Sequence, residues 1–230
     1  MTFLWIALAA YALLAWKDHR AAFFLFIASL PVYLIRLQVA GLPTTALEAM
    51  FAILFAAWML RREKRLIDIK GWGWLLLAWL AVATVSLFVS PAFRAAAGVW
   101  KAYFVEPILL FLIANDLLRT RSERLNAMKA LAWSAIAIGL STIIQHWTDW
   151  GVPPPFNGHP IPPATEAEFR PTSFYGFPNA IGLFLAPLAP IFVSLAFARP
   201  EGVKERVPAR WLFASAALLS AAGIVLAQSE

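Results

Sequence analysis

Two charged residues lie inside a strongly apolar stretch of the chain, AAAGVWKAYFVEPILLFLIAN at residues 95–115. Counted along a helix that enters a membrane at residue 95, Lys101 lies roughly 9 Å deep and Glu106 lies near the bilayer centre. A carboxylate at that depth costs about 3 kcal/mol. We therefore expect Glu106 to face the interior of a helix bundle and to be paired, hydrogen-bonded or protonated there.

Lys101 and Glu106 are five residues apart, which is about 140° around an unbroken α-helix. The sequence therefore predicts that their partners come from other helices. Pro107 also leaves a carbonyl near Tyr103 without its helical donor, which is expected to kink the helix and to offer another polar group. The pair has two interpretations: a substrate or proton site, or a buried charge that only fixes helix packing.

Most Lys and Arg residues of the chain lie in a few basic clusters, which are described below. Four cations lie outside these clusters: Arg36, Arg94, Lys101 and Arg170. Each of them can be explained by itself as a side chain that extends to lipid headgroups from a helix end. The four cations come from four separate segments, and we expect all of them in the outer half of the membrane. They could therefore converge on an anionic substrate presented from the outer leaflet, such as a phosphate or pyrophosphate.

Arg170 precedes the start of an apolar run, in the stretch FRPTSFYGFPNAIG at residues 169–182. Pro178 and Asn179 mark the start of the next helix, and asparagine is a good N-cap residue. A helix N-terminus carries unpaired backbone N–H groups and a partial positive charge. If the loop folds back over this helix end, Arg170 and the helix start form two sides of a phosphate-binding corner.

His146 and His159, in IIQHW and NGHP, are candidates for titration near neutral pH. Neither has a second histidine or a carboxylate at helical ligand spacing, so we expect no metal site. The chain contains no G-x-x-x-x-G-K-[ST] phosphate loop, no G-x-G-x-x-G and no G-x-S-x-G. Nucleotide hydrolysis and serine-hydrolase chemistry are therefore unsupported, and the absence of cysteine removes thiolate nucleophiles.

Membrane helices are the elements that must position these residues. The chain is 61% hydrophobic and only 14% charged, which excludes an ordinary soluble domain. A transmembrane helix needs roughly 20 largely apolar residues, and the chain has seven to eight such runs. The sequence therefore predicts one all-α, polytopic transmembrane helix bundle over residues 1–230. Its expected spans are 2–16, 21–40, 43–60, 71–90, 95–115, 126–147, 179–198 and 211–228.

All but four of the 19 Lys and Arg residues lie in four clusters between these runs. The clusters are KDHR (17–20), RREKRLIDIK (61–70), RTRSERLNAMK (119–129) and RPEGVKERVPAR (199–210). The positive-inside rule places them in the cytoplasm and the N-terminus outside. The charge of +6 then reflects topology, and no nucleic-acid partner is expected. The proline-rich loop 148–178 falls on the outer side, as a substrate-facing element or a passive linker.

Several stretches together resemble the O-antigen ligase and O-antigen polymerase superfamily of the bacterial inner membrane. They are LPTTALEAMFAILFAAWML (42–60), VWKAYFVEPILLFLI (99–113), RPTSFYGFPNAIGLFLAPLAP (170–190) and the terminal GIVLAQSE. The resemblance implies an all-helical, multi-pass glycosyltransferase of ten or more spans that needs no metal, cofactor or nucleotide sugar. Such an enzyme transfers a glycan from an undecaprenyl-pyrophosphate carrier to a lipid or polysaccharide acceptor on the periplasmic side.

In that family, arginines at the outer face engage the donor pyrophosphate. Motif position implies this role for Arg170, and conjecture extends it to Arg36, Arg94 and Lys101. The family then has a Ser-Arg-Gly-like element, a large periplasmic loop with a functional histidine and more spans, whereas this sequence closes on Gln-Ser-Glu at residues 228–230. We therefore expect an N-terminal fragment of a longer enzyme.

Two other functions fit the residues. One is a secondary transporter or channel that uses Lys101 and Glu106 as intramembrane charges. The other is a non-catalytic subunit of a membrane assembly. The sequence assigns no catalytic base, because Glu106 is expected to be too deep and His159 has no supporting motif.

Overall fold

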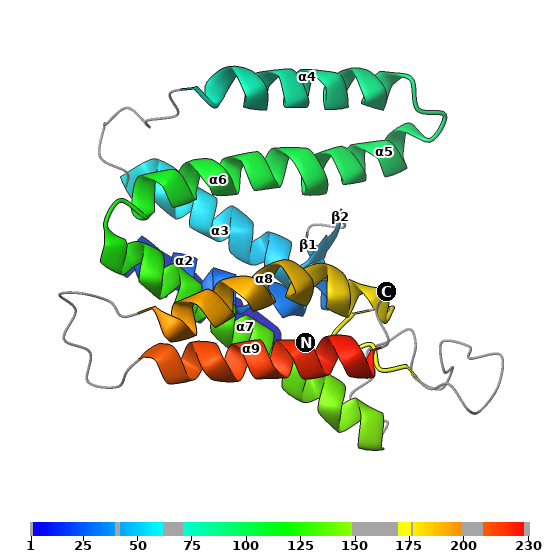
Figure 1. Ribbon diagram of the computed structural model, residues 1–230. Helices are drawn as coiled ribbons and strands as arrows, with labels where there is room; N and C mark the ends of the chain where they lie inside the picture. Colours follow the sequence, from blue (N-terminus) through cyan, green and yellow to red (C-terminus); the bar gives the residue numbers. More distant parts are fainter. Residues whose placement is uncertain are drawn as a thin grey trace. The chain divides into compact units, whose positions relative to one another are not determined.

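The computed structural model describes residues 2–39, 42–61, 71–148, 170–175, 177–198 and 209–227 (Figure 1). Nearly all of these residues are helical, and a single pair of short strands is found among them, so the all-α prediction is confirmed. Four helices in this part are long and apolar enough to cross a membrane: Phe93–Leu117, Arg121–Thr148, Asn179–Phe197 and Ala209–Leu226. These are features of a membrane protein, while the further spans and their orientation stay predictions.

The chain divides into two compact units, which are described one at a time. The first unit comprises Met1–Phe23 and Met50–Arg124. Its elements are α1 (Thr2–Lys17), the start of α2 (His19–Ala28), most of α3 (Ala46–Arg61), α4 (Gly73–Phe88), α5 (Phe93–Trp100), the π-helical turn η2 (Lys101–Val105), α6 (Glu106–Leu117) and the first turn of α7 (Arg121–Thr148). α5, η2 and α6 follow one another without a break as a single helix of 25 residues.

In the first unit, α4 lies alongside this long helix (Figure 1). The indole Nε1 of Trp100 donates a hydrogen bond to the Thr84 hydroxyl over 3.1 Å, and the Trp79 ring meets Phe104 edge-on with centroids 5.7 Å apart. Most of the long helix nevertheless stays exposed, because only 6% of an apolar stretch of 18 residues within it is buried. Such a surface is suited to lipid, where apolar side chains carry no penalty.

The second unit comprises Phe24–Ala49 and Leu125–Glu230. Its elements are the rest of α2, the 3₁₀ helix η1 (Leu30–Leu34), the strands β1 (Arg36–Val39) and β2 (Leu42–Thr45), the start of α3, α7 from Leu125 onward, α8 (Asn179–Phe197) and α9 (Ala209–Leu226). β1 and β2 pair antiparallel, with Arg36 opposite Thr45. α8 and α9 pack side by side (Figure 1).

The span expected at residues 21–40 is not one helix. α2 ends at Ala28, and the chain continues through η1 into β1. Pro31 explains the change, because proline has no N–H to continue an α-helical ladder and is tolerated in the first turn of a new element. The backbone tightens just before it, where the Ser29 N–H donates to the carbonyls of both Leu25 and Phe26 at 3.0 Å. The apolar run therefore contains a helix, a 3₁₀ turn and a strand.

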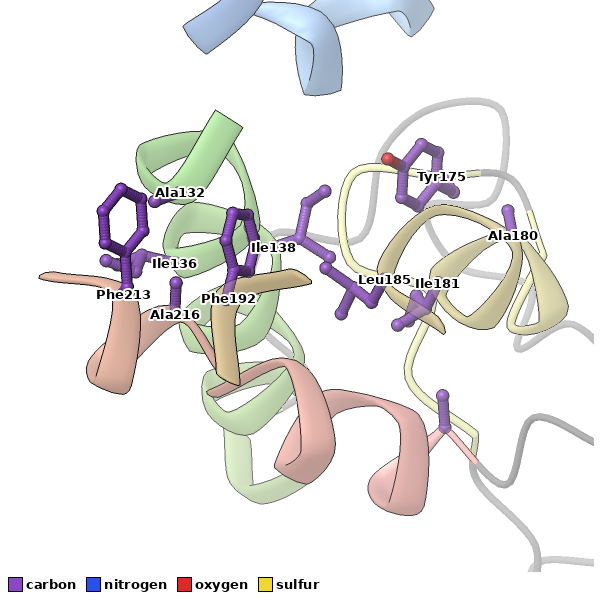
Figure 2. Packing of buried hydrophobic residues seen from close by; sticks show 12 residues of the cluster. Ala132, Ile136, Ile138, Tyr175, Ala180, Ile181, Leu185, Phe192, Phe213 and Ala216 are labelled. Atoms are coloured by element: carbon purple, nitrogen blue, oxygen red, sulfur yellow. The ribbon is translucent and has the colours of Figure 1, made fainter. Parts of the chain in front are cut away.

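The core of the second unit lies between α7, α8 and α9 (Figure 2). Its best-buried aromatic pair is Phe192 from α8 and Phe213 from α9, whose rings stack with centroids 6.1 Å apart. α7 contributes Ala132, Ala135, Ile136 and Ile138 to the same cluster. The small alanines allow the helices to approach closely, as is common between membrane helices.

α7 and α9 approach almost to backbone contact at Gly139. A Cβ atom added to Gly139 would lie 2.6 Å from the carbonyl oxygen of Leu219 in α9. On the other side, a Cβ atom on Gly223 would lie 3.5 Å from the Cα of Gly139. Only glycine fits at position 139 without moving one of the two helices.

Candidate functional site

Arg170 joins the ends of two helices in the second unit. Its Nε donates a hydrogen bond to the carbonyl oxygen of Ala227, just past α9, over 2.9 Å. Its Nη2 donates to Oδ1 of Asn179, the first residue of α8, over 2.8 Å. These two bonds orient the guanidinium. The C-terminal carbonyls of a helix also carry partial negative charge, which favours a cation at Ala227.

A tight turn directly after Arg170 fixes its backbone. The Tyr175 N–H donates to the Thr172 carbonyl over 2.9 Å, and Ser173 has a φ of 54°. A positive φ is uncommon for serine and persists only where the surroundings hold it. The turn is therefore imposed by its contacts with the rest of the unit.

Gln145, near the end of α7, supplies three of those contacts. Its Oε1 accepts the N–H groups of Thr172 at 3.0 Å and Ser173 at 2.7 Å, and its Nε2 donates to the Ser173 carbonyl at 2.8 Å. The Gln145 side chain is 1% exposed. One buried amide thus pairs three backbone groups of this turn. We call this arrangement the Gln145 clamp.

Hydroxyl groups reinforce the Gln145 clamp on the same face of α7. The Ser173 hydroxyl donates to the Ile138 carbonyl over 3.2 Å and is hydrogen-bonded to the Ser141 hydroxyl. Thr142 also donates to the Ile138 carbonyl, over 2.8 Å. Sequence reasoning missed this network and considered His146 instead. The available signal was the spacing of Ser141, Thr142 and Gln145 on one face of an apolar helix.

Tyr175 closes the turn on its other side. Its ring lies 5.6 Å from that of Tyr33 and 6.3 Å from that of Phe184 in α8, measured between centroids. Burial raises the pKa of the Tyr175 phenol above its ordinary value, with a smaller contribution from Tyr33. The phenol therefore stays neutral and acts as a packing group that holds the turn against α8.

The start of α8 differs from the prediction by one residue. Pro178 occupies the N-cap position, and Asn179 is the first helical residue, with its Oδ1 directed to Arg170. The N–H groups of Ala180 and Ile181 donate to the carbonyls of Phe177 at 3.2 Å and Pro178 at 3.0 Å. Both bonds join residues three apart, so the first turn of α8 has 3₁₀ geometry. If this corner binds an anion as the sequence predicts, the guanidinium and the helix dipole would contribute more than unpaired N–H groups.

The other predicted cations lie in both units. Arg36 is exposed in β1 of the second unit, which also contains Arg170. Arg94 is exposed in the first turn of α5, and Lys101 begins η2, both in the first unit. Each unit is described by itself, so the convergence of all four cations on one substrate stays a prediction.

Lys101 and Glu106 form an ion pair, contrary to the expectation for an unbroken α-helix. Lys101 Nζ lies 3.7 Å from Glu106 Oε1. The reason is the π-helical turn between them: the Glu106 N–H donates to the carbonyl of Lys101, five residues back. A π turn has more residues per turn, which brings positions i and i+5 to the same side. Pro107 favours this change because it cannot donate to the carbonyl of Tyr103.

Of the two histidines singled out in the sequence, the structure describes one. His146 lies in the last turn of α7 beside Trp147, with the two rings edge-to-face and their centroids 5.1 Å apart. His159 lies outside the described residues. Within the described ranges, no three His, Asp or Glu side chains are grouped closely enough to hold a metal ion.

Comparisons with protein-family models, with curated proteins and with solved structures give no significant match to this chain.

Proposed function

We propose that the chain is a membrane glycosyltransferase of the O-antigen ligase or polymerase type, located in the bacterial inner membrane. It would transfer a glycan from an undecaprenyl-pyrophosphate carrier to a lipid or polysaccharide acceptor on the periplasmic face. The observation that carries the proposal is the position of Arg170 at the start of α8, where Asn179 and Ala227 orient its guanidinium.

The chemistry explains why an oriented arginine suits this reaction. An acceptor hydroxyl attacks the anomeric carbon of the donor sugar and forms a new glycosidic bond. The bond from that carbon to the pyrophosphate oxygen breaks, and negative charge grows on the leaving group. A guanidinium stays protonated and binds phosphate oxygens bidentately, so Arg170 would stabilise the transition state more than the bound donor. The proton of the acceptor passes to a base that we do not assign.

α7 supports a periplasmic location for Arg170. Its first turn carries Arg121 and Arg124, and Gln145, which holds the Arg170 turn, lies in its last turn. The helix has 28 residues. At about 1.5 Å per residue it is longer than the roughly 30 Å hydrocarbon layer. If the Arg121 end of α7 lies in the cytoplasm, as the positive-inside rule requires, the Gln145 end reaches the outer surface.

The test is glycan transfer by purified protein in proteoliposomes that contain the undecaprenyl-pyrophosphate-linked donor and an acceptor. Arg170→Lys and Arg170→Ala should lower the transfer rate by about 10²- to 10³-fold, the usual effect of removing one charge-stabilising group. Arg210→Ala is the matched control, because Arg210 lies at the start of α9, the end opposite the Ala227 contact. Wild-type rates in both Arg170 variants would refute the site. No transfer by the unsubstituted full-length protein would refute the function.

A secondary transporter or channel is the second candidate, and the π turn in the long helix favours it. A charge pair next to an irregular turn in an apolar helix is the type of site at which transporters bind ions. Solute or proton flux into proteoliposomes that disappears in Glu106→Gln would support this candidate. Flux that persists in the Glu106→Gln protein would refute it.

A further inference from the structure

Five helix ends meet at one end of the first unit. Arg61 at the end of α3 donates to the carbonyl of Lys17 at the end of α1 over 3.4 Å. Arg20 in the first turn of α2 pairs with Glu123 in the first turn of α7, with the charged atoms 2.5 Å apart. α6 reaches the same end, because Asp116 accepts the indole N–H of Trp58 in α3 over 2.8 Å. We call this region the basic end.

The described residues of the basic end contain six cations and three carboxylates. The cations are Lys17, Arg20, Arg61, Arg119, Arg121 and Arg124, and the carboxylates are Asp18, Asp116 and Glu123. Each carboxylate already has a structural role in the helix ends. Asp18 accepts the first N–H groups of α2, Glu123 forms a capping box with Thr120, and Asp116 holds Trp58 and Arg119. The basic end therefore has an excess of positive charge.

Trp16 and Arg61 give this charge a defined position. The guanidinium carbon of Arg61 lies 5.6 Å from the centroid of the Trp16 ring, so one cation bridges α1 and α3. Trp16 is 56% exposed, and both Lys17 and Arg61 are exposed. A cation held over an indole ring is typical of the boundary between lipid headgroups and acyl chains.

Apolar side chains continue from this cationic corner toward the middle of both helices. Leu13 is 68% exposed and lies three residues before Trp16, on the same face of α1. Leu60, next to Arg61 in α3, is 73% exposed. An exposed apolar surface with an adjacent cationic rim matches a phospholipid, whose acyl chains join a charged headgroup. Soluble anions such as free phosphate would use only the rim.

We propose that the basic end binds an anionic phospholipid between the last turns of α1 and α3. Its phosphate contacts the Arg61 guanidinium and the Lys17 ammonium, and its acyl chains pack on Leu13, Trp16 and Leu60. The excess of cations favours a headgroup with net negative charge over a zwitterionic one. This proposal does not rest on the proposed glycan transfer, whose Arg170 belongs to the second unit.

Native mass spectrometry of the detergent-solubilised protein tests this site. Phosphatidylglycerol and phosphatidylcholine with the same acyl chains are titrated separately, and the bound fraction is measured. Phosphatidylglycerol should bind more tightly, and Arg61→Gln and Lys17→Gln should each lower its affinity by about fivefold. The double variant should lower it by about 25-fold if the two contributions are independent. Both side chains are exposed, and a circular dichroism spectrum checks that each variant is folded.

Arg210→Gln is the matched control for charge alone. Arg210 also lies over an indole, with its guanidinium carbon 5.3 Å from the Trp211 ring centroid, but that ring belongs to the next residue of the same helix. Its loss should leave phosphatidylglycerol affinity unchanged. An equal loss in Arg210→Gln and Arg61→Gln would refute a defined site in favour of general electrostatic attraction. Unchanged affinity in the double variant, or equal affinity for the two lipids, would also refute the proposal.

Discussion

Replacing Gln145 by methionine is expected to release the Arg170 turn while the shape of α7 is kept. The substitution removes the three hydrogen bonds of the Gln145 clamp. The N–H groups of Thr172 and Ser173 and the Ser173 carbonyl then lose this partner in a region where Thr172 is 3% exposed and Ser173 is 0% exposed. Each unsatisfied buried group costs about 1 to 3 kcal/mol. For three groups the total is about 3 to 9 kcal/mol. Because the turn can open and let these groups bond to water, we expect a net destabilisation of about 3 kcal/mol, at the lower end of that range.

Hydrogen exchange measured by mass spectrometry on a peptide that covers residues 170–175 is the direct assay for the Gln145→Met protein. A loss of about 3 kcal/mol accelerates exchange by roughly 10²-fold if the turn opens locally. Gln38→Met is the matched control, because Gln38 is exposed in β1. It should leave exchange in the turn unchanged. Equal exchange rates at residues 170–175 in wild type and Gln145→Met would refute the assigned role of the clamp.

Two further predictions concern helix geometry. Gly139→Ala should destabilise the second unit by about 1 to 3 kcal/mol because the added methyl overlaps α9, whereas Gly98→Ala, with open space around it, should stabilise α5 by about 1 kcal/mol. Denaturant titrations in detergent measure both changes, and equal behaviour of the two alanine variants would contradict the close crossing. Pro107→Ala should restore α-helical hydrogen bonding and move Lys101 away from Glu106. A double-mutant cycle that reverses the charges at these two positions measures their interaction free energy, which should be smaller in the Pro107→Ala protein.

Helix positions were predictable from the sequence because apolar runs with clear boundaries produce membrane helices almost independently of their partners. The break at Pro31 was missed because proline is tolerated in membrane helices, and only the pairing of β1 with β2 reveals the alternative. The contact of Arg170 with Asn179 was predictable, since a helix start close in sequence limits where the arginine can reach. The Gln145 clamp was not predictable, because it joins residues that are 27 and 28 positions apart in the sequence.

The four predicted cations are not equivalent, and a ranking of their effects can be tested. Lys101 Nζ lies 3.7 Å from Oε1 of the Glu106 carboxylate, which offsets its charge. Asn179 and Ala227 orient the Arg170 guanidinium. The Lys101–Glu106 pair should therefore rank below Arg170, the proposed donor contact, in its effect on glycan transfer.

A comparison of transfer rates tests this ranking. The double variant Lys101→Gln, Glu106→Gln removes both charges together, which avoids leaving a carboxylate in the membrane without that partner. We expect it to transfer glycan within about tenfold of wild type, because the pair contributes little net charge, while Arg170→Lys loses about 10²-fold. If the double variant loses as much as Arg170→Lys, then Lys101 contributes to the donor site despite its ion pair, and the ranking is wrong.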